Sequence, residues 1–331
     1  MTAAQADLRA RIEAALPGVL TDTRLPGLER SLRGKVRDNY DLADGRRLII
    51  ATDRQSAFDQ VLAAVPFKGQ VLTSVAQYWF EATADFCRNH VIAFPDPNVT
   101  VARRLSMLPV EVVARDYLAG TTATSIWPMY RDGHRLLYGI RFPEGLRKNE
   151  KLPATILTPT TKGAHGDHDA PISAGEIVDR HLLTSAQWDE VSALALALFA
   201  RGRELAAQRG LILVDTKYEF GLDKDGSIVL ADEIHTPDSS RWWASDSYQR
   251  RFEQGEDPET LDKDFLRRWI VARCDPYKEA IPAIPAETIV DFALRYIALY
   301  ERITGDTFIP PPPHPPVHER IRENLTRYLA Q

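Results

Sequence analysis

Three charged residues at short spacing could hold a metal ion and a phosphate group: Lys217, Glu219 and Asp232. They lie in two runs of alternating apolar residues on either side of the segment DKDG (223–226), which is typical of a hairpin turn. If that segment is the loop, Lys217 lies opposite Asp232 in the second strand. Glu219 then lies opposite Leu230, and all three charged side chains project from one face of the hairpin.

A cation and two carboxylates on one face of a sheet suit a metal–phosphate site better than a core. Glu219 and Asp232 supply hard oxygen ligands, which fit Mg²⁺ better than zinc. Lys217 could offset phosphate charge or hold a carboxylate in place. The alternative is a charged, exposed hairpin face whose cross-strand ion pairs are each worth under about 1 kcal/mol.

Two further cations occur in the segment GKVRDNY (34–40), where Lys35 and Arg37 share one face of a predicted strand. Gly34 allows close backbone approach, and the two cations could hold a polyphosphate. The alternative is a solvated edge strand whose positive charge prevents aggregation. The sequence contains neither a Walker A loop nor a G-x-G-x-x-G motif, so a P-loop and a Rossmann site are not supported.

Three more segments could contact anions. Asp53 and Arg54 follow a predicted strand, where they either line a ligand or pair with each other. Arg115 precedes a glycine- and hydroxyl-rich loop that could cradle an anion, although a plain loop would have the same composition. The segment TPDSSR (236–241) offers a further anion-binding set.

The segment 157–173 gathers Lys162, two histidines and two aspartates, the second of which is Asp169. Their spacing matches neither H-E-x-x-H nor a pair on one helix face, which argues against zinc. The composition favours a polar lid over a substrate, and a solvated surface loop is the alternative.

The elements that must position these residues are strands early in each half and helices later. Strands are predicted around a turn at 43–45 and at 111–118. The clearest helix is 182–210, which Ser185 would cap and Gly210 would end. The order indicates an α+β architecture with a β-rich lobe at 1–110 and an α+β lobe at 111–331, which includes a proline-rich strap and a terminal helix.

The bulk composition narrows the class of protein. A net charge of −5 over 331 residues argues against a nucleic-acid or anionic-membrane partner. The two cysteines are far apart and form no disulfide framework or metal motif, which fits a reducing compartment. No run approaches the roughly 20 apolar residues that span a bilayer, and the first residues do not have the pattern of a signal peptide. We therefore expect a cytoplasmic enzyme.

Seven segments together resemble one family, the phosphoribosylaminoimidazole-succinocarboxamide synthases, or SAICAR synthetases. In chain order they are GKVRDNY, DRQSAFD, GQVLT…WF, VVARDYLAGT, LPATILTPTTK with GDHDAPIS, DTKYEFGLD and ADEIHTPDSSRWW. Each motif is weak alone, but seven in order make a specific match. The segment TATSIWPMY resembles the longer, plant- and cyanobacteria-like branch of the family. One departure is Thr121, since the family often has serine after this glycine.

The resemblance implies a carbon–nitrogen ligase of de novo purine biosynthesis. ATP, L-aspartate and carboxyaminoimidazole ribonucleotide would give SAICAR, ADP and phosphate. The implied fold is two α+β lobes with antiparallel sheets and a nucleotide cleft, distantly similar to ATP-grasp enzymes. All three substrates are anionic, so the site must supply cations, N–H donors and Mg²⁺. The alternatives are a small-molecule kinase of similar fold and a catalytically silent nucleotide-binding protein, and the oligomeric state stays open.

The resemblance also implies a role for each candidate residue. Lys217, Glu219 and Asp232 would form the catalytic set, in which Glu219 and Asp232 bind Mg²⁺. The residues that would contact ATP are Lys35, Arg37, Met107, Leu108, Lys162 and Glu219. The residues that would contact the other substrates are Asp53, Arg115, Thr121, Ser125, Asp169, Asp238, Ser239 and Arg241.

Overall fold

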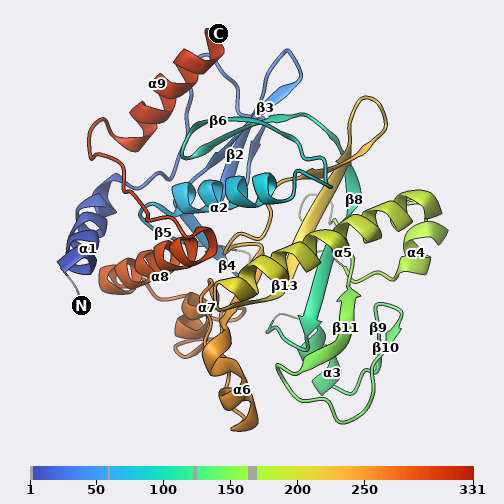
Figure 1. The fold of residues 1–331 in the computed structure, drawn as a ribbon. Coiled ribbons are helices and arrows are strands. Elements are labelled where there is room, and N and C mark those ends of the chain that lie inside the picture. The colour runs from blue at the N-terminus through green and yellow to red at the C-terminus, as the bar shows by residue number, and fades with distance from the viewer. Residues whose placement is uncertain (1–2, 59, 122–124, 163–169) are drawn as a thin grey trace. The chain divides into compact units, whose positions relative to one another are not determined.

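A computed structural model describes residues 3–58, 60–121, 125–162 and 170–331 (Figure 1). The chain divides into two compact units. Unit 1 comprises residues 1–78, 91–104 and 261–331, and unit 2 comprises residues 79–90 and 105–260. Each unit contains an antiparallel sheet with helices, so the predicted α+β class is confirmed.

Unit 1 is built on a five-stranded antiparallel sheet with the order β1-β2-β3-β7-β6. Its strands are β1 (Leu32–Arg33), β2 (Arg37–Asp41), β3 (Arg46–Ala51), β6 (Val91–Asp96) and β7 (Val99–Arg103), with a separate pair, β4 (Arg54–Ala57) and β5 (Gln60–Ala64). Its helices are α1 (Ala3–Ala15), the start of α2 (Lys68–Ala82), α7 (Asp264–Val271), α8 (Ala286–Thr304) and α9 (Val317–Leu329), with a 3₁₀ turn at Leu16–Gly18.

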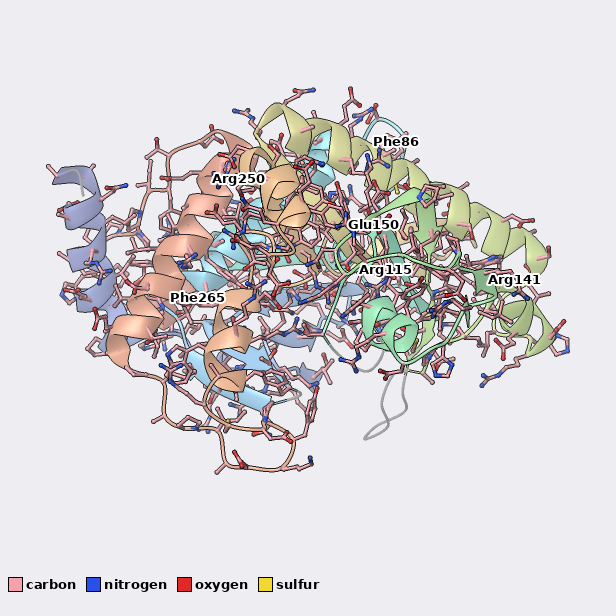
Figure 2. The ribbon with its side chains drawn as sticks, turned by 90° about the horizontal axis from the view of Figure 1, so that it is seen from below. Phe86, Arg115, Arg141, Glu150, Arg250 and Phe265 are labelled. Atoms are coloured by element: carbon pink, nitrogen blue, oxygen red, sulfur yellow. The ribbon has the colours of Figure 1, made fainter. Side chains whose placement is uncertain are left out.

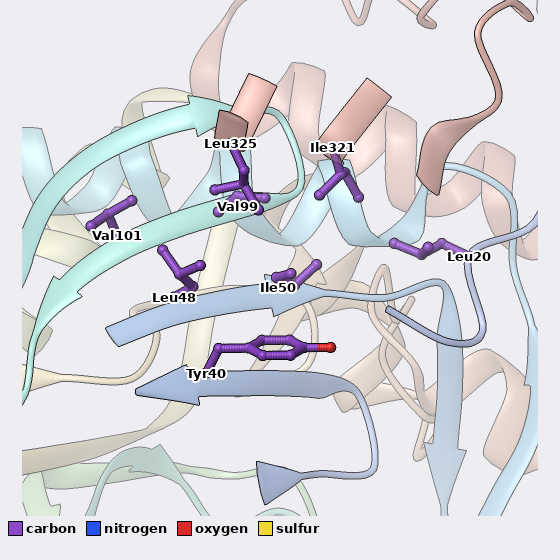
Figure 3. Close-up of a cluster of buried hydrophobic side chains, with 8 residues drawn as sticks. All are labelled: Leu20, Tyr40, Leu48, Ile50, Val99, Val101, Ile321 and Leu325. Carbon is purple, nitrogen blue, oxygen red and sulfur yellow. The ribbon is translucent and has the colours of Figure 1, made fainter. Parts of the chain in front are cut away.

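The core beside this sheet is formed by apolar residues at alternate positions along its strands. Tyr40 on β2 lies directly opposite Leu48 on β3, which confirms the hairpin predicted around 43–45. Both are almost fully buried, and they share a cluster with Ile321 and Leu325 of α9 (Figure 3). Residues two apart on a strand share a face, so the apolar side chains on one face of the sheet pack together against the terminal helix α9.

The packing of α9 explains why the compact units differ from the lobes expected from the chain order. Residues 261–331 fall in unit 1, although the sequence placed everything after residue 110 in the second lobe. The apolar face of α9 is covered by strands more than 200 positions earlier, and chain order carries no signal for that partner.

Unit 2 is built on a six-stranded antiparallel sheet. Strands β11-β8-β13-β14 follow one another, while β12 also pairs with β8 and β15 also pairs with β13. The strands are β8 (Ser106–Tyr117), β11 (Lys151–Leu157), β12 (Thr160–Thr161), β13 (Leu211–Leu222), β14 (Ile228–Ala231) and β15 (Ser240–Ala244), with a separate pair, β9 (Leu136–Leu137) and β10 (Ile140–Arg141). The helices are α3 (Ile126–Arg131), α4 (Ala174–Asp179), α5 (Ser185–Gln208) and α6 (Ser245–Glu253).

Helix α5 runs along one face of this sheet (Figure 1) and confirms the predicted helix within a few residues at its start. The predicted cap was wrong by one position. Thr184, not Ser185, is the N-cap, and its hydroxyl accepts a hydrogen bond from the backbone N–H of Gln187 at 3.2 Å. The Gln187 side chain accepts a bond in return from the Thr184 N–H at 3.0 Å, and this reciprocal pair favours Thr184. Gly210, with φ +66°, follows the helix end as expected.

Among the helices that the structure describes, none is long and apolar enough to cross a bilayer.

Candidate active site

Strand β13 carries alternating charged and apolar side chains on its two faces. Asp215, Lys217 and Glu219 share one face, while Tyr218 and Phe220 lie on the other and are almost fully buried. Asp215 and Glu219 are nevertheless largely buried, and charged residues are seldom buried without partners, so this face is a candidate for polar ligands.

Neighbouring strands complete an acid–lysine cluster around Glu219, made of Glu111, Lys162, Lys217 and Glu219. The Lys217 amine donates to Oε1 of Glu219 at 2.7 Å and to Oε1 of Glu111 at 2.8 Å. Glu111 lies on β8 directly opposite Glu219. The Lys162 amine donates to the second oxygen of Glu219. Each oxygen of the Glu219 carboxylate therefore accepts a hydrogen bond from a lysine ammonium group.

The charges of this cluster stabilise one another. Burial disfavours the charged form of Lys217, but the carboxylates of Glu219, Glu111 and Asp232 outweigh that effect and raise its pKa. Burial would likewise raise the pKa of Glu219, but Lys217 and Lys162 hold it low, at about 2. At neutral pH Lys217 is an ammonium and Glu219 a carboxylate.

The predicted strand register was wrong by one residue. Glu219 lies opposite Ala231, not Leu230, and Leu222 lies opposite Ile228. The loop between the strands has five residues, 223–227, and within it the backbone N–H of Asp223 donates to the Ser227 carbonyl at 3.0 Å. The extra loop residue shifts every later partner by one position.

Asp232 does not lie in the second strand, as the sequence predicted, but directly after it. Strand β14 ends at Ala231, and Asp232 has a left-handed backbone conformation with φ +58°. Its charge is among those that raise the pKa of Lys217. The charge of Asp232 thus acts on Lys217, but Asp232 lies beyond the end of β14 and does not share the strand face predicted for it.

A second cluster lies along the same sheet, two residues from the first, and is formed by Arg115, Asp215 and Arg241. Asp215 lies opposite Arg115 on β8 and opposite Arg241 on β15. The Arg115 guanidinium (Figure 2) donates from Nη1 to Asp215 at 2.8 Å, and Arg241 donates to the same carboxylate oxygen. Two cations share one carboxylate, so this cluster has a net charge of +1.

A second hydrogen bond, to a hydroxyl group, holds the Arg115 side chain in place. Its Nε donates to the Thr158 hydroxyl at 2.7 Å, and its side chain is 8% exposed. Burial lowers the pKa of the Arg115 guanidinium, and the contact with Asp215 opposes that shift. A guanidinium held at two edges in this way is pre-organised to bind a carboxylate or phosphate.

The glycine of the loop after β8 leaves room beside Arg241. A Cβ on Gly120 would lie 2.3 Å from the Ser125 side chain and 3.1 Å from Nη2 of Arg241, and the φ of +109° also favours glycine. Ser125 is buried, whereas Thr121 is exposed. The structure thus brings Ser125 close to Arg241, and it places Thr121 on the exposed side of the same loop.

The predicted anion-binding segment at 236–241 forms a tight turn that is tied to β13. The Thr236 hydroxyl accepts from the backbone N–H groups of Asp238 and Ser239, both at 3.2 Å. The Ser239 carbonyl accepts from the Lys217 N–H at 3.1 Å. The turn therefore has a defined place beside the acid–lysine cluster, with Asp238 and Ser239 half-buried.

The candidates in unit 1 are arranged differently from the prediction. Lys35 lies in the turn between β1 and β2, and Arg37 begins β2, so the two do not share a strand face. A Cβ on Gly34 would lie 2.9 Å from the Arg37 carbonyl oxygen, which explains the glycine. The tight turn ends the first strand at Arg33, and the sequence pattern did not show that break.

Asp53 binds the backbone of its own unit. Its two oxygens accept from the N–H groups of Leu20 and Gly69, at 2.8 and 3.0 Å, and burial raises its pKa to about 6. Arg54 pairs with Asp38 at 2.6 Å, so the alternative of an Asp53–Arg54 pair was wrong. These contacts favour a structural role for Asp53 over substrate binding.

The two residues predicted to contact adenine lie on β8. Strand β8 begins at Ser106, five residues before the predicted start, so Met107 and Leu108 lie within it. Met107 is 37% exposed and Leu108 is buried. Asp169 lies outside the described residues.

Two residues of the site were missed from sequence. Glu111 begins the predicted strand 111–118, and Asp215 lies two residues before Lys217. The period-two spacing of Asp215, Lys217 and Glu219 was visible, and it could have identified Asp215. Nothing in the sequence pairs Glu111 with Lys217, because their strands are far apart in the chain.

His235 supports this site from the opposite face of the sheet. Its Nε2 is 2.6 Å from the Tyr218 hydroxyl, and its ring packs edge-on against Trp79 with the ring centroids 4.7 Å apart. The ring is fully buried, and burial lowers its pKa to about 3. The folded protein therefore holds His235 neutral.

We expect His235 to make the protein less stable in acid. Its pKa is about 3 in the folded protein and returns to its ordinary value of 6.5 on unfolding, so the unfolded chain binds the extra proton between those values. Stability is fully present above about pH 6.5 and falls as the pH drops toward 3, by about 2 kcal/mol between pH 7 and pH 5. Urea unfolding at both pH values should show this loss in the wild type and a smaller loss in His235→Phe. Equal losses of stability in the two proteins would contradict the role of His235. Other titrating groups, such as Asp53, contribute equally to both proteins, so the comparison removes their effect.

The sequence is similar to those of known proteins of one family. The family model described as SAICAR synthetase matches residues 30–284. The phosphoribosylaminoimidazole-succinocarboxamide synthase of Legionella pneumophila (strain Paris) is 53% identical over 316 residues, which cover 95% of this chain and 100% of that protein. The chloroplastic enzyme of the same name from Arabidopsis thaliana is 49% identical over 324 residues, covering 96% and 78%. A plant relative at this identity supports the resemblance to the longer branch.

Solved structures show the same similarity. The SAICAR synthase of Saccharomyces cerevisiae, complexed with SAICAR, aligns with a TM-score of 0.76 and 31% identity, covering 87% of this chain and 99% of that one. A SAICAR synthetase (Type-2) in complex with ADP aligns with a TM-score of 0.64 and 25% identity, covering 84% and 99%.

Proposed function

The chain belongs to the SAICAR synthetase family, and we propose that the two charged clusters of unit 2 carry out the ATP-dependent ligation of L-aspartate to carboxyaminoimidazole ribonucleotide. The products are SAICAR, ADP and phosphate, and the reaction is a step of de novo purine biosynthesis. The observation that carries the proposal is the row of charges along one sheet face, with a net positive cluster at 115/215/241 beside an acid–lysine cluster at 111/162/217/219.

The chemistry explains why both clusters are needed. A carboxylate is a poor electrophile, and transfer of a phosphoryl group from ATP to it creates a leaving group that the aspartate amine can displace. ATP and the two other substrates all carry negative charge, so the site must neutralise it and position the reacting groups. One cluster can serve the acceptor and the other the phosphates, because both lie within one sheet.

The arginine cluster suits the ribonucleotide and its carboxylate. Arg115 and Arg241 converge on one Asp215 oxygen, and Ser125 lies beside Arg241. Guanidinium groups bind carboxylate and phosphate through paired N–H donors. We assign acceptor binding to Arg115, Ser125 and Arg241, with Thr121, Asp238 and Ser239 as further contacts from the adjoining loops.

The acid–lysine cluster suits ATP and Mg²⁺. Mg²⁺ is usually held by one or two carboxylates and completes its shell with phosphate and water oxygens, which matches the carboxylates of Glu219 and Asp232. A bound Mg²⁺ would neutralise phosphate charge during transfer. Lys162 contacts Glu219 directly, and we assign it to the same phosphates, while Lys217 links the carboxylates of Glu111 and Glu219.

The candidate ATP contacts outside this cluster rest on the family resemblance. We assign phosphate contacts to Lys35 and Arg37, and adenine contacts to Met107 and Leu108. Met107 is the more exposed of that pair, so it is the better placed to touch a base.

We expect Lys35→Ala to raise the ATP concentration needed for half-maximal rate by roughly tenfold, because one charge-assisted hydrogen bond to phosphate is lost. Steady-state kinetics with varied ATP measures this. Lys35→Arg keeps the charge and should recover most of the affinity. An unchanged ATP requirement in Lys35→Ala would show that the turn is structural.

Release of phosphate tests the function itself. The protein is assayed with ATP, Mg²⁺, L-aspartate and the carboxylated ribonucleotide, and each is omitted in turn. The proposal expects phosphate release to require all four. Release of ADP without L-aspartate would identify a small-molecule kinase, and no release under any condition would identify a catalytically silent nucleotide-binding protein.

A further inference from the structure

Glu111 is a buried carboxylate that the proposed reaction does not use. Its side chain is 9% exposed, it lies opposite Glu219 on the neighbouring strand, and its Oε1 accepts from Lys217 at 2.8 Å. Neither the metal nor any substrate is assigned to it. Its role must therefore be sought in what it does to Lys217.

The proposed metal site creates a problem that Glu111 can solve. Both oxygens of Glu219 are occupied by ammonium groups, one from Lys217 and one from Lys162. A cation of charge +2 on the same carboxylate repels both amines strongly in a poorly solvated site. Binding of Mg²⁺ to Glu219 would therefore weaken the contacts of that carboxylate with both lysines and favour the release of one of them.

The two lysines differ in what else they contact. Lys217 has Glu111 as a second carboxylate at hydrogen-bond distance. Within the described residues, the contacts of Lys162 are with Glu219 and, through its backbone, with Pro109. Lys217 would thus keep Glu111 as a partner if Glu219 and Asp232 bound the metal, whereas Lys162 has no second carboxylate at hydrogen-bond distance among the described residues.

We propose that Glu111 is a positioning residue that retains Lys217 when Glu219 binds Mg²⁺, so that Lys162 is the lysine that transfers to the ATP phosphates. This inference rests on the proposed function. Glu111 touches neither ATP nor the metal, and it acts through Lys217. Without Glu111, Lys217 loses its second carboxylate partner and competes with Mg²⁺ for Glu219.

The first test measures Mg²⁺ binding without turnover. Calorimetric titration of ADP at a series of Mg²⁺ concentrations gives the Mg²⁺ concentration that half-saturates ADP binding. In Glu111→Gln this concentration should rise roughly tenfold, the effect of one lost hydrogen bond to a charged group. Glu190→Gln, at an exposed glutamate on α5, removes the same charge from the same unit and should leave it unchanged. Circular dichroism and the thermal midpoint establish that both variants are folded.

A double-mutant cycle separates positioning from direct metal binding. In a Lys217→Met background, Glu111→Gln should shift the Mg²⁺ requirement several-fold less than it does in the wild type, because the residue through which Glu111 acts is gone. An equal or larger shift would make Glu111 a metal ligand and overturn the proposal. No shift in either background would also overturn it.

Amine acylation followed by peptide mass spectrometry gives a second readout. Adding Mg²⁺ and a non-hydrolysable ATP analogue to the wild type should protect Lys162 and leave Lys217 as slow to react as before. In Glu111→Gln the same addition should raise the Lys217 rate, and an unchanged rate would contradict the proposal. If the wild type fails to bind ADP at any Mg²⁺ concentration, the proposed function fails instead, so the two failures are distinguishable.

Discussion

We expect Asp232→Asn to lose at least about 100-fold of the ATP- and L-aspartate-dependent turnover while remaining folded, because the variant lacks a carboxylate that we assign to Mg²⁺, and Mg²⁺ would stabilise the charge of the transferred phosphoryl group. Asp232 has φ +58°, and asparagine adopts this left-handed conformation more readily than most residues. The substitution therefore removes the carboxylate charge and keeps the backbone. Coupled measurement of phosphate release and of SAICAR formation, at saturating substrates, gives the loss.

Asp225→Asn is the matched control for this prediction. Asp225 lies in the loop of the same hairpin, its side chain is 62% exposed, and it contacts Ser227 and Arg88. This variant loses the same charge a few residues away and should keep turnover near the wild-type value. Wild-type turnover in Asp232→Asn would remove Asp232 from the metal site and leave Glu219 as its remaining candidate ligand.

Asp215→Asn should destabilise the protein by about 3 kcal/mol and reduce turnover, because removing one partner of a buried ion pair leaves the others uncompensated. Asp215 is the carboxylate between Arg115 and Arg241, and its side chain is 7% exposed. Without its charge, two guanidinium groups face each other across β13. They also lose the acceptor that aims them at the substrate.

Denaturant unfolding followed by tryptophan fluorescence measures the stability part of this prediction. Five of the six tryptophans lie in unit 2, so the signal reports on the unit that contains Asp215. The control is Asp225→Asn, because Asp225 is 62% exposed and its partner Arg88 is 54% exposed, and an exposed pair is worth under about 1 kcal/mol. A loss in Asp215→Asn no larger than in this control would show that the arginines find other partners.

Much of the site could be predicted because its signals are local. The alternation of Lys217 with Glu219 places them on one face in any register, and the seven motifs with their order identify the family. The position of Arg115 near the end of a strand, before a loop rich in glycine and hydroxyl groups, is also confirmed. Each of these inferences depends on residues close together in the chain.

The errors arose where one residue or one distant partner decides the outcome. The hairpin loop includes Ser227 and so has five residues instead of the predicted four, which shifts the register. Asp232 lies beyond the strand in a left-handed conformation, and its charge still acts on Lys217. Lys35 lies in a turn because Gly34 lets the chain reverse beside Arg37. A pattern of residue types does not distinguish these cases, since the competing conformations differ by few interactions.

The sequence by itself determined the residue types, their period-two spacing on β13 and the family to which they belong. The tertiary structure alone decided which charges meet. Arg115 and Asp215 are 100 positions apart, and Glu111 and Lys217 are 106 apart, yet each pair is in hydrogen-bond contact. The physical reason is that strand pairing brings β8, β13 and β15 together through backbone hydrogen bonds. Those bonds are nearly independent of side-chain identity, so the sequence specifies the strands more clearly than it specifies their neighbours.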